Sequence, residues 1–387
     1  MKLLKQRRVR RRTLKNHRAY LKSILASEQL QKDIIKEELT EVKEKYGDER
    51  RTQIAFSEGE INIEDLIPNR KVVVTISHLG YIKRTLVDEY RSQGRGGKGS
   101  IGAKTRDTDE IEHMFVAKNH DYLLLFTEKG ICHWIRVFEL PEGSKASTGR
   151  VIRNMLNLSI DDKIRAYIPI KDLKDDEILD SHNLIFTTAN GKIKKTPLKA
   201  FANPRSNGII AIAINDDDQL LNVKLTDGDT EMIIANNKGY AIRFNESTVR
   251  QMGRNTAGVK AMSLGKNTKV IGSIALKQED MDKTILVISE NGMGKRSSID
   301  DYRLTNRGGK GVKTLQLTEK TGSLVAIMSV SEYDSLMITT KAGVIIRTPI
   351  SSIRVMGRAT QGVRVINLDS QDTIADIALI FNDNKEL

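Results

Sequence analysis

Beyond residue 51 the sequence repeats one pattern six times: an apolar run, a glycine turn and a basic segment. The turn glycines are 50, 61, 48, 53 and 51 residues apart, and a second glycine follows each after 19 residues, or 17 in the third unit. The turn glycines are Gly80, Gly130, Gly191, Gly239, Gly292 and Gly343, and the second glycines are Gly99, Gly149, Gly208, Gly258, Gly311 and Gly362. Agreement at two positions across six units identifies internal repeats.

Each unit contains enough apolar runs for four short strands, as at residues 312–317 and 324–330 of the fifth unit. A lone four-stranded sheet cannot bury both of its faces, whereas sheets stacked around an axis can. The repeats therefore predict an all-β six-bladed propeller over residues 68–381, preceded by an α-helical N-terminal segment. We expect the acidic insertion near residues 172–180 to form a surface loop between the second and third blades.

The N-terminal segment carries much of the chain's formal charge of +13. Residues 1–20 are crowded with Lys and Arg, which predicts a frayed or disordered segment because like charges repel. Over residues 21–51 apolar residues recur at spacings near three and four, which is typical of one amphipathic helix or two in succession. Gly47 is placed to end this helical region.

Composition and motifs exclude several classes of protein. No apolar run is long enough to span a membrane, and one cysteine, Cys132, cannot build a disulfide framework or a zinc site. The histidines show no metal-ligand spacing, and no nucleophile signature is present. We therefore predict no metal site, no catalytic residues and no cofactor for this chain. We expect the run at residues 216–218 to be a solvated turn.

Cations recur just after the turn glycines. The fourth residue after this glycine is basic in five of six units, and the third is a lysine in alternate units. These residues are Arg84, Lys195, Arg243, Arg296 and Arg347, and Lys83, Lys194 and Lys295; Trp134 takes the place in the second unit. Equivalent positions repeat around the axis, so they predict a belt of cations on the rim that matches a bent phosphate backbone. Protection of edge strands is the alternative explanation.

A glycine-rich segment at residues 93–99 gives the densest local signal. Its glycines let the backbone approach an anion, and it lacks the Lys and Ser or Thr of a nucleotide-binding Walker loop after Gly99. Related segments recur at residues 253–258, 306–311 and 357–362. The additional predicted DNA-binding residues are Gln93, Gly94, Arg95, Gly96, Gly97, Lys98, Gly99, Arg254, Arg307, Lys310 and Arg358. Aromatic residues make up only 5% of the chain, which favours duplex over stacked single strands.

Residues 93–99 resemble the Q-x-R-G-G-x-G box of the C-terminal DNA-wrapping domain of bacterial DNA gyrase A, part of a type IIA topoisomerase. Residues 47–54 resemble the junction between the coiled-coil arm of gyrase A and this domain, which makes residues 21–51 the remnant of the arm. The resemblance implies a six-bladed β-pinwheel that wraps double-stranded DNA and so supports ATP-dependent negative supercoiling by the complete enzyme. Residues 1–18 do not resemble the arm.

The resemblance also sets expectations for activity and partners. The family's catalytic tyrosine belongs to a domain that this chain does not contain, and Tyr20 has no claim to its role, so we expect no catalysis by the chain alone. Gyrase B and the rest of gyrase A are the expected partners, with ATP and Mg²⁺ bound on other domains, no membrane, and a cytoplasmic, nucleoid-associated location. The alternatives are the corresponding domain of topoisomerase IV and a propeller that serves only as a protein-interaction platform.

Overall fold

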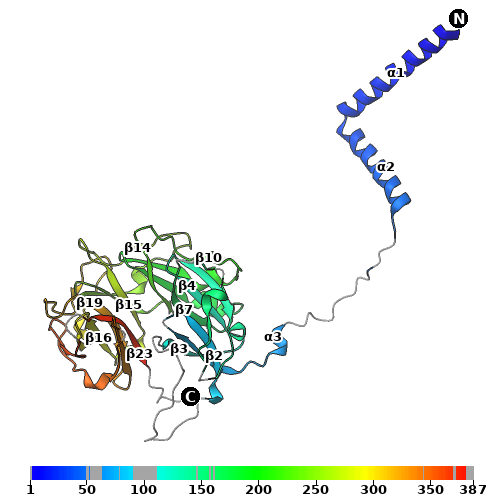
Figure 1. Cartoon of the computed structure of the whole chain (residues 1–387). Helices are drawn as coiled ribbons and strands as arrows, with labels where there is room; N and C mark the ends of the chain where they lie inside the picture. The colour runs from blue at the N-terminus through cyan, green and yellow to red at the C-terminus, as the bar shows by residue number, and fades with distance from the viewer. Residues whose placement is uncertain are drawn as a thin grey trace. The chain divides into compact units, whose positions relative to one another are not determined.

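The computed structural model describes residues 2–48, 52, 63–77, 79–89, 111–144, 147–156, 158–159, 162–342, 344–368 and 372–380. The chain divides into two compact units, Met1–Asn62 and Ile63–Leu387. The first unit is helical and the second contains the strands, in agreement with the predicted order of a helical segment followed by a β propeller (Figure 1).

Two helices form the first unit, α1 (Lys2–Ala26) and α2 (Glu28–Tyr46). Ser27 separates them, because its hydroxyl accepts a hydrogen bond from the amide of Leu30 and caps α2. The α2 helix ends at Gly47 as predicted, and the amide of Gly47 donates to the carbonyl of Lys43. The prediction that residues 1–20 are frayed or disordered is wrong from residue 2 onward. Lys, Arg and Leu have high intrinsic helix propensity, and all side chains described before Ser23 are exposed to solvent, which screens their repulsion.

The second unit consists of six antiparallel sheets. The first two sequence repeats contain β1 (Lys71–Ser77), β2 (Tyr81–Leu86), β3 (Ile111–Lys118), β4 (Tyr122–Thr127), β5 (Ile131–Arg136), β6 (Arg150–Val151) and β7 (Ile164–Ile170). The next two use β8 (Asn183–Thr188), β9 (Lys192–Pro197), β10 (Ile209–Ile210), β11 (Leu220–Thr226), β12 (Glu231–Asn236), β13 (Tyr240–Asn245), β14 (Val259–Lys260) and β15 (Val270–Leu276). The last two use β16 (Thr284–Ser289), β17 (Met293–Ser298), β18 (Val312–Lys313), β19 (Leu324–Val330), β20 (Ser335–Thr340), β21 (Ile345–Pro349), β22 (Val363–Arg364) and β23 (Ile374–Ile380).

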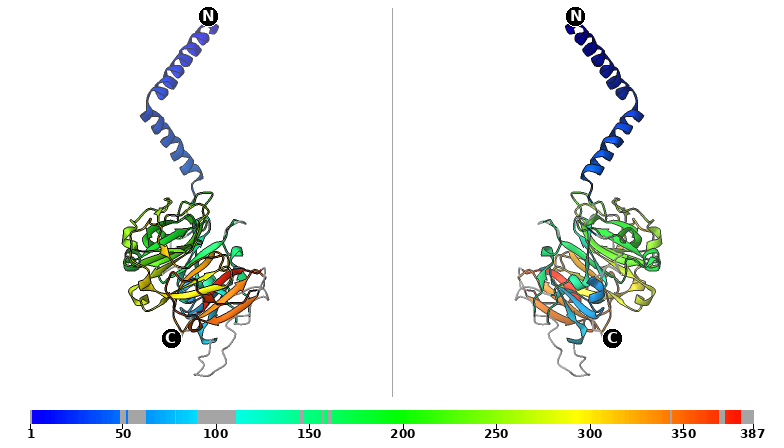
Figure 2. Two further views of the ribbon diagram at one scale, coloured as in Figure 1. Left: turned by 90° about the vertical axis from the view of Figure 1, so that its left-hand side faces the viewer. Right: turned by 90° about the vertical axis from the view of Figure 1, so that its right-hand side faces the viewer.

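The blades exchange strands. The sheet orders are β3-β1-β2-β6, β7-β4-β5-β10, β11-β8-β9-β14, β15-β12-β13-β18, β19-β16-β17-β22 and, among the described residues, β23-β20-β21. The fourth strand of each complete blade has only two residues and comes from the next repeat along the chain. At the opposite edge, β7, β11, β15, β19 and β23 contact one another in series around the axis. The two-residue strands therefore lie at the outer edges of the blades, and Figure 2 shows the sheets following one another in chain order.

Both sets of repeated glycines have structural reasons. All turn and second glycines in the described residues have positive φ, between 72° and 83°. The second glycines additionally lie against the preceding blade: a Cβ on Gly311 would be 2.4 Å from the carbonyl oxygen of Ala241 in β13. The second glycine is therefore the point where the chain enters the preceding blade, and it has no room for a side chain.

The hydrophobic core lies between consecutive blades. Five clusters of buried residues occupy the five junctions from the first blade to the sixth. Between the second and third blades, Phe126 packs edge-on against Phe186 and Phe201, with ring centroids 5.4 and 5.9 Å apart. Burial of each large apolar side chain contributes about 1.5–3 kcal/mol, so the stacking of blades stabilises the fold.

Short helices complete the framework. The acidic insertion lies between the second and third blades as predicted, but it is not simply a surface loop. It contains α4 (Asp176–Ser181), capped by Asp175, and Leu179 of this helix is buried in the core between these blades. The short helix α3 (Ile63–Leu66) precedes β1 and forms an ion pair through Glu64 with Arg136 of β5. Each blade also has a 3₁₀ helix after the second hairpin strand: η1 (Val87–Glu89), η2 (Val137–Glu139), η4 (Leu198–Phe201), η5 (Glu246–Thr248), η7 (Ile299–Asp301) and η8 (Ile350–Ser352).

We predict that Gly311→Ala destabilises the propeller by about 1–3 kcal/mol or more, because alanine is strained at positive φ and its Cβ meets a backbone carbonyl. Gly253→Ala is the matched control, since Gly253 has no positive φ and a Cβ there meets nothing within 4 Å. Urea unfolding should show a loss of stability for the first variant alone. Equal losses would contradict the close approach at Gly311.

Candidate nucleic-acid interface

The fourth residue after each turn glycine fastens one blade to the next. In five successive units its side chain donates a hydrogen bond to a main-chain carbonyl in, or directly after, the 3₁₀ helix of the following unit. The donor and acceptor residues are Arg84 with Leu140 (2.9 Å), Trp134 with Phe201 (3.0 Å), Lys195 with Glu246 (3.3 Å), Arg243 with Ile299 (3.0 Å) and Arg296 with Ile353 (2.7 Å). Trp134 fits this series because its indole N–H replaces the cation as donor.

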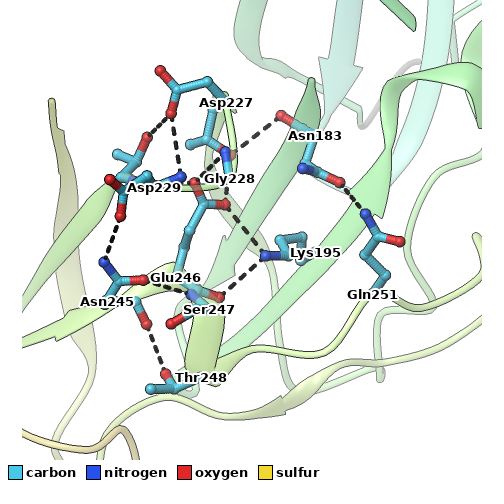
Figure 3. Close-up of polar contacts among 12 residues, drawn as sticks. Asn183, Lys195, Asp227, Gly228, Asp229, Asn245, Glu246, Ser247, Thr248 and Gln251 are labelled. Carbon is cyan, nitrogen blue, oxygen red and sulfur yellow. Dashed lines mark hydrogen bonds and ion pairs between the residues drawn. The ribbon is translucent and has the colours of Figure 1, made fainter. Parts of the chain in front are cut away.

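The junction between the third and fourth blades contains a fully buried carboxylate. Glu246 accepts hydrogen bonds from the amides of Gly228 and Thr230 and from the hydroxyl of Thr226, and its Oε2 lies 3.6 Å from Nζ of Lys195 (Figure 3). Three donors and one ammonium group offset the loss of hydration that burial imposes on this charge. Lys195 is therefore part of the joint between blades, with an exposed fraction of 8%.

The lysines three residues after the turn glycines are also buried. Lys194 and Lys295 have exposed fractions of 0%, and Lys83 has 2%. Nζ of Lys83 donates to the carbonyls of Ser144 and Ser147 at 2.9 and 2.8 Å. Lys194 and Lys295 donate in the same way to Arg254 and Gly357, both at 2.5 Å. Each lysine thus lies beneath the loop that precedes the second glycine of the following unit, and its hydrogen bonds stabilise that loop.

Burial makes these ammonium groups easier to deprotonate. Desolvation, followed by repulsion from Arg254, lowers the pKa of Lys194 from 10.5 to about 7. Desolvation also lowers the pKa of Lys295 to about 8, where Asp301 opposes the shift and Arg358 adds to it. The pKa of Lys83 is lowered by desolvation as well, against the attraction of Glu89.

The predicted exposed belt is therefore wrong for most of its members. Lys83, Lys194, Lys195, Lys295 and Arg296 are buried, while Arg84 and Arg243 are partly buried and bound to neighbouring groups. The error has a physical reason: a cation on a strand can donate to the carbonyls of a neighbouring blade, which is invisible in one sequence. Arg347 is the exposed member, and its guanidinium donates to the hydroxyl of Ser335 at 3.2 Å.

Cations that reach solvent lie in the loops before the second glycines and on the two-residue outer strands. Of the predicted residues, Lys310 is exposed and Arg254, Arg307 and Arg358 are partly exposed, whereas residues 93–99 lie outside the part of the chain that the structure describes. Further exposed or partly exposed cations, which the repeat pattern did not single out, lie within three residues of a second glycine: Arg150, Arg205, Lys260, Lys313 and Arg364. Their short distance in sequence from the second glycine is the signal that could have identified them.

Hydrogen bonds join these loops into a continuous rim from the third unit to the sixth. The amide of Ala213 donates to the carbonyl of Thr256, Ser263 donates to Gly309, and Gln316 donates to Thr360 (3.1, 2.8 and 3.0 Å). The guanidinium groups of two loop arginines add links to the preceding outer strand: Arg307 to the carbonyl of Lys260 (2.9 Å) and Arg358 to that of Lys313 (3.0 Å). A basic surface at fixed spacing is suited to a polyanion.

The described residues give little support for a metal site, a reactive cysteine or a membrane-spanning helix. They contain no group of three or more His, Cys, Asp or Glu side chains that could hold a metal ion. Cys132 is buried, and desolvation raises the pKa of its thiol well above the ordinary value, so it is not an activated nucleophile. Asp218 accepts hydrogen bonds from the amides of Asn190 and Gln219 in a turn. None of the described helices is long and apolar enough to cross a membrane.

The fold and the rim define a six-bladed propeller with exchanged outer strands and a basic perimeter. The profile of the DNA gyrase C-terminal domain family, described as a beta-propeller, matches six segments: 71–118, 121–177, 182–227, 230–277, 283–331 and 334–380. The chain belongs to this family. The predicted resemblance and the predicted six-bladed fold are thus confirmed.

Similar proteins agree with this assignment. The A subunit of DNA gyrase from Staphylococcus epidermidis is 42% identical over 361 residues, which are 93% of this chain and 40% of that protein. The Staphylococcus aureus (strain MRSA252) protein is 40% identical over 374 residues, 96% of this chain and 42% of its own length. The chain thus spans about two fifths of these relatives.

Two solved structures share the fold. The C-terminal domain of DNA topoisomerase IV has a TM-score of 0.70 at 28% identity, covering 81% of this chain and 94% of its own. The DNA gyrase A C-terminal domain has a TM-score of 0.61 at 29% identity, covering 81% of this chain and all of its own. The sequence relatives named above are gyrase proteins, so the topoisomerase IV alternative is not better supported.

We predict that Lys195→Met destabilises the protein by about 3–5 kcal/mol, because it leaves the buried Glu246 carboxylate without its cation. Lys199→Met is the control: Lys199 pairs with Asp176 and Asp180 on the surface, where such pairs contribute about 0–1 kcal/mol. Urea unfolding measures both. Similar losses for the two variants would show that the buried pair has no special role.

Lys194 should make stability depend on pH. Its pKa is about 7 in the folded protein against an ordinary value of 10.5, so between these pH values the unfolded chain holds the extra proton. Stability contributed through this group therefore rises with pH across that window. We expect the stability of the wild type relative to Lys194→Met to increase from about pH 7 to about pH 9 in thermal unfolding. An unchanged difference would contradict a lowered pKa.

Proposed function

We propose that the chain binds and wraps duplex DNA around its rim, as the C-terminal part of a DNA gyrase A protein. The observation that carries this proposal is the basic rim, in which cations recur near each second glycine on loops that hydrogen bonds hold in register. Lys and Arg at regular spacing neutralise phosphates without contacting the bases, so we expect binding to show little preference for DNA sequence.

Curvature turns binding into wrapping. The outer strands follow one another around the axis, so a duplex that contacts successive loops bends with the rim. In the complete enzyme, the wrapped segment supports ATP-dependent negative supercoiling, with gyrase B and the rest of gyrase A as partners in a topoisomerase complex. ATP and Mg²⁺ bind on those other domains, the location is cytoplasmic and nucleoid-associated, and this chain alone wraps DNA without cutting it.

The glycine-rich segment at residues 93–99 is the proposed fastening point. Arg95 and Lys98 supply its charge, and Gln93 with the four glycines Gly94, Gly96, Gly97 and Gly99 lets the backbone approach a phosphate. Fastening at one site fixes where the duplex starts to bend, which gives the wrap a defined handedness.

We predict that Arg95→Ala with Lys98→Ala abolishes wrapping and leaves the fold intact, because loop charges contribute little to stability. Nicked plasmid is closed by ligase in the presence of the purified chain, and the topoisomers are resolved. The wild type should shift the plasmid toward positive writhe and the double variant should not. Lys277→Ala with Lys283→Ala is the control of equal charge, placed on the connection between β15 and β16. Unaltered writhe in the box variant would reject the assignment.

Binding should weaken steeply with salt. Each neutralised phosphate lowers the logarithm of the binding constant by about 0.9 for each tenfold rise in salt concentration. Titration of a fluorescent duplex at several salt concentrations, with two unrelated sequences, measures the slope and the sequence preference. A slope near zero, or strong discrimination between the sequences, would contradict phosphate recognition by the rim.

A further inference from the structure

The residue three positions after each turn glycine alternates around the propeller. It is Lys83, Lys194 and Lys295 in the first, third and fifth units, and His133, Ile242 and Ile346 in the others. In the first five units this side chain lies beneath the loop of the next unit: Lys83, Lys194 and Lys295 donate to loop carbonyls, His133 is close to Gly208, and Ile242 is close to Gly309. Two kinds of side chain therefore lie beneath the loops: an ammonium group, or a group that is not permanently charged.

Loops above a lysine share one internal structure. In the fourth and sixth units the hydroxyl of a threonine donates to a carbonyl three residues earlier, Thr256 to Gly253 and Thr360 to Gly357, both at 2.9 Å. Ser147 donates to Ser144 in the same way in the second unit. Carbonyls of these loops therefore accept hydrogen bonds from a hydroxyl group of the same loop and from the lysine beneath it, and these bonds stabilise the loop conformation.

The loop above Ile242 is built differently. Residues 307–311 read Arg-Gly-Gly-Lys-Gly, the same five residues as 95–99, and contain no hydroxyl residue. A Cβ at Gly309 would be 3.5 Å from Cδ1 of Ile242, so an apolar group supports the loop in place of an ammonium. The loop is also held from the side: Arg307 donates to the carbonyls of Thr248 and Lys260 at 3.0 and 2.9 Å. Arg358 makes a contact like the second one, to Lys313, and the bond to Thr248 is additional.

Charge distinguishes the loop above Ile242 from the loops above Lys194 and Lys295. Arg254 and Arg358 each help to lower the pKa of the lysine beneath their loop, Lys194 and Lys295 respectively, so cation and loop arginine repel each other. A second cation in such a loop would add to this repulsion, and neither loop has one. Where Ile242 replaces the lysine, the repulsion is absent, and the loop carries a second cation, Lys310.

Lys310 is placed to meet a ligand. Its side chain is exposed, and Nζ lies 4.9 Å from the ring centroid of Tyr240 on the neighbouring strand β13. The ring holds the ammonium over the outer strand pair β13 and β18 without neutralising it. Lys260 and Lys313, the last residues of the outer strands β14 and β18, extend the positive surface on the two neighbouring blades.

We propose that residues 306–311 form a second fastening loop, which holds a phosphate of the wrapped duplex more tightly than the lysine-based loops at 253–258 and 357–362. Arg307 is a positioning residue, because its guanidinium ties the loop to the preceding unit, and Lys310 provides the contact. The inference rests on the proposed function. Duplex DNA is the ligand because the loop lies on the same continuous rim as the other exposed cations.

The test compares two rim lysines of equal charge, Lys310→Ala and Lys260→Ala, in the full chain. The plasmid closure assay measures writhe, and the salt dependence of duplex affinity counts phosphate contacts. We expect Lys310→Ala to lose most of the writhe and to lower the salt slope by about 0.9. Lys260→Ala removes one weaker rim contact and should lose only a small part of the writhe. Arg307→Lys, which keeps the charge and loses the two-carbonyl contact, should reduce writhe with little change in salt slope.

The outcomes separate the two proposals when the Arg95→Ala, Lys98→Ala variant is measured alongside. Equal effects of Lys310→Ala and Lys260→Ala would overturn the second fastening loop, because the rim would then act as a uniform belt. Loss of writhe in the box variant with full writhe in Lys310→Ala would also overturn it and leave the proposed function standing. Full writhe in every variant would reject both.

Discussion

The propeller depends on hydrogen bonds that each repeat donates to the backbone of the next. The donor lies four residues after the turn glycine, and the acceptor is a carbonyl at the next 3₁₀ helix, in five consecutive junctions. The carbonyls of Leu140, Phe201 and Ile353 lie at or just after the end of a short helix, where the helix supplies no partner, so a side chain from the neighbouring blade satisfies them. Those of Glu246 and Ile299 begin their helices and accept the neighbouring side chain in addition to a helical amide. Blade stacking and strand exchange bring donor and acceptor together, and the bonds from Lys195 and Arg296 are buried.

This arrangement changes the meaning of the chain's positive charge. Many of the cations that recur at a fixed distance from the turn glycines are buried and join one blade to the next. They contribute less to the electric field outside the protein than a surface lysine does. Binding charge lies instead at the perimeter, within a few residues of the glycines where the chain crosses into the preceding blade. The same short segments thus complete one blade and present cations to solvent, which couples the integrity of the sheet to the binding surface.

The rim loops differ because the side chain that lies beneath them differs. A lysine beneath a loop supplies donors to its carbonyls and repels cations above it, as between Lys194 and Arg254. An isoleucine supplies neither, so the loop above Ile242 relies on glycines and on Arg307 for its shape. Repeats that have the same glycine spacing therefore differ in the number of cations that their loops carry, and a wrapped duplex would meet a stronger contact at residues 306–311 than at 253–258 or 357–362.

The amino-acid sequence by itself determined the number of repeats, the propeller class and the end of α2 at Gly47, since glycines at positive φ and apolar runs leave a periodic signal. The helix at residues 2–20 was missed because local charge repulsion was given more weight than helix propensity. Only the tertiary structure decided which cations are exposed: Lys194 and Lys310 are equally basic in the sequence, yet one is enclosed by the next unit and the other is not. That difference depends on contacts between residues about sixty positions apart, which no local pattern encodes.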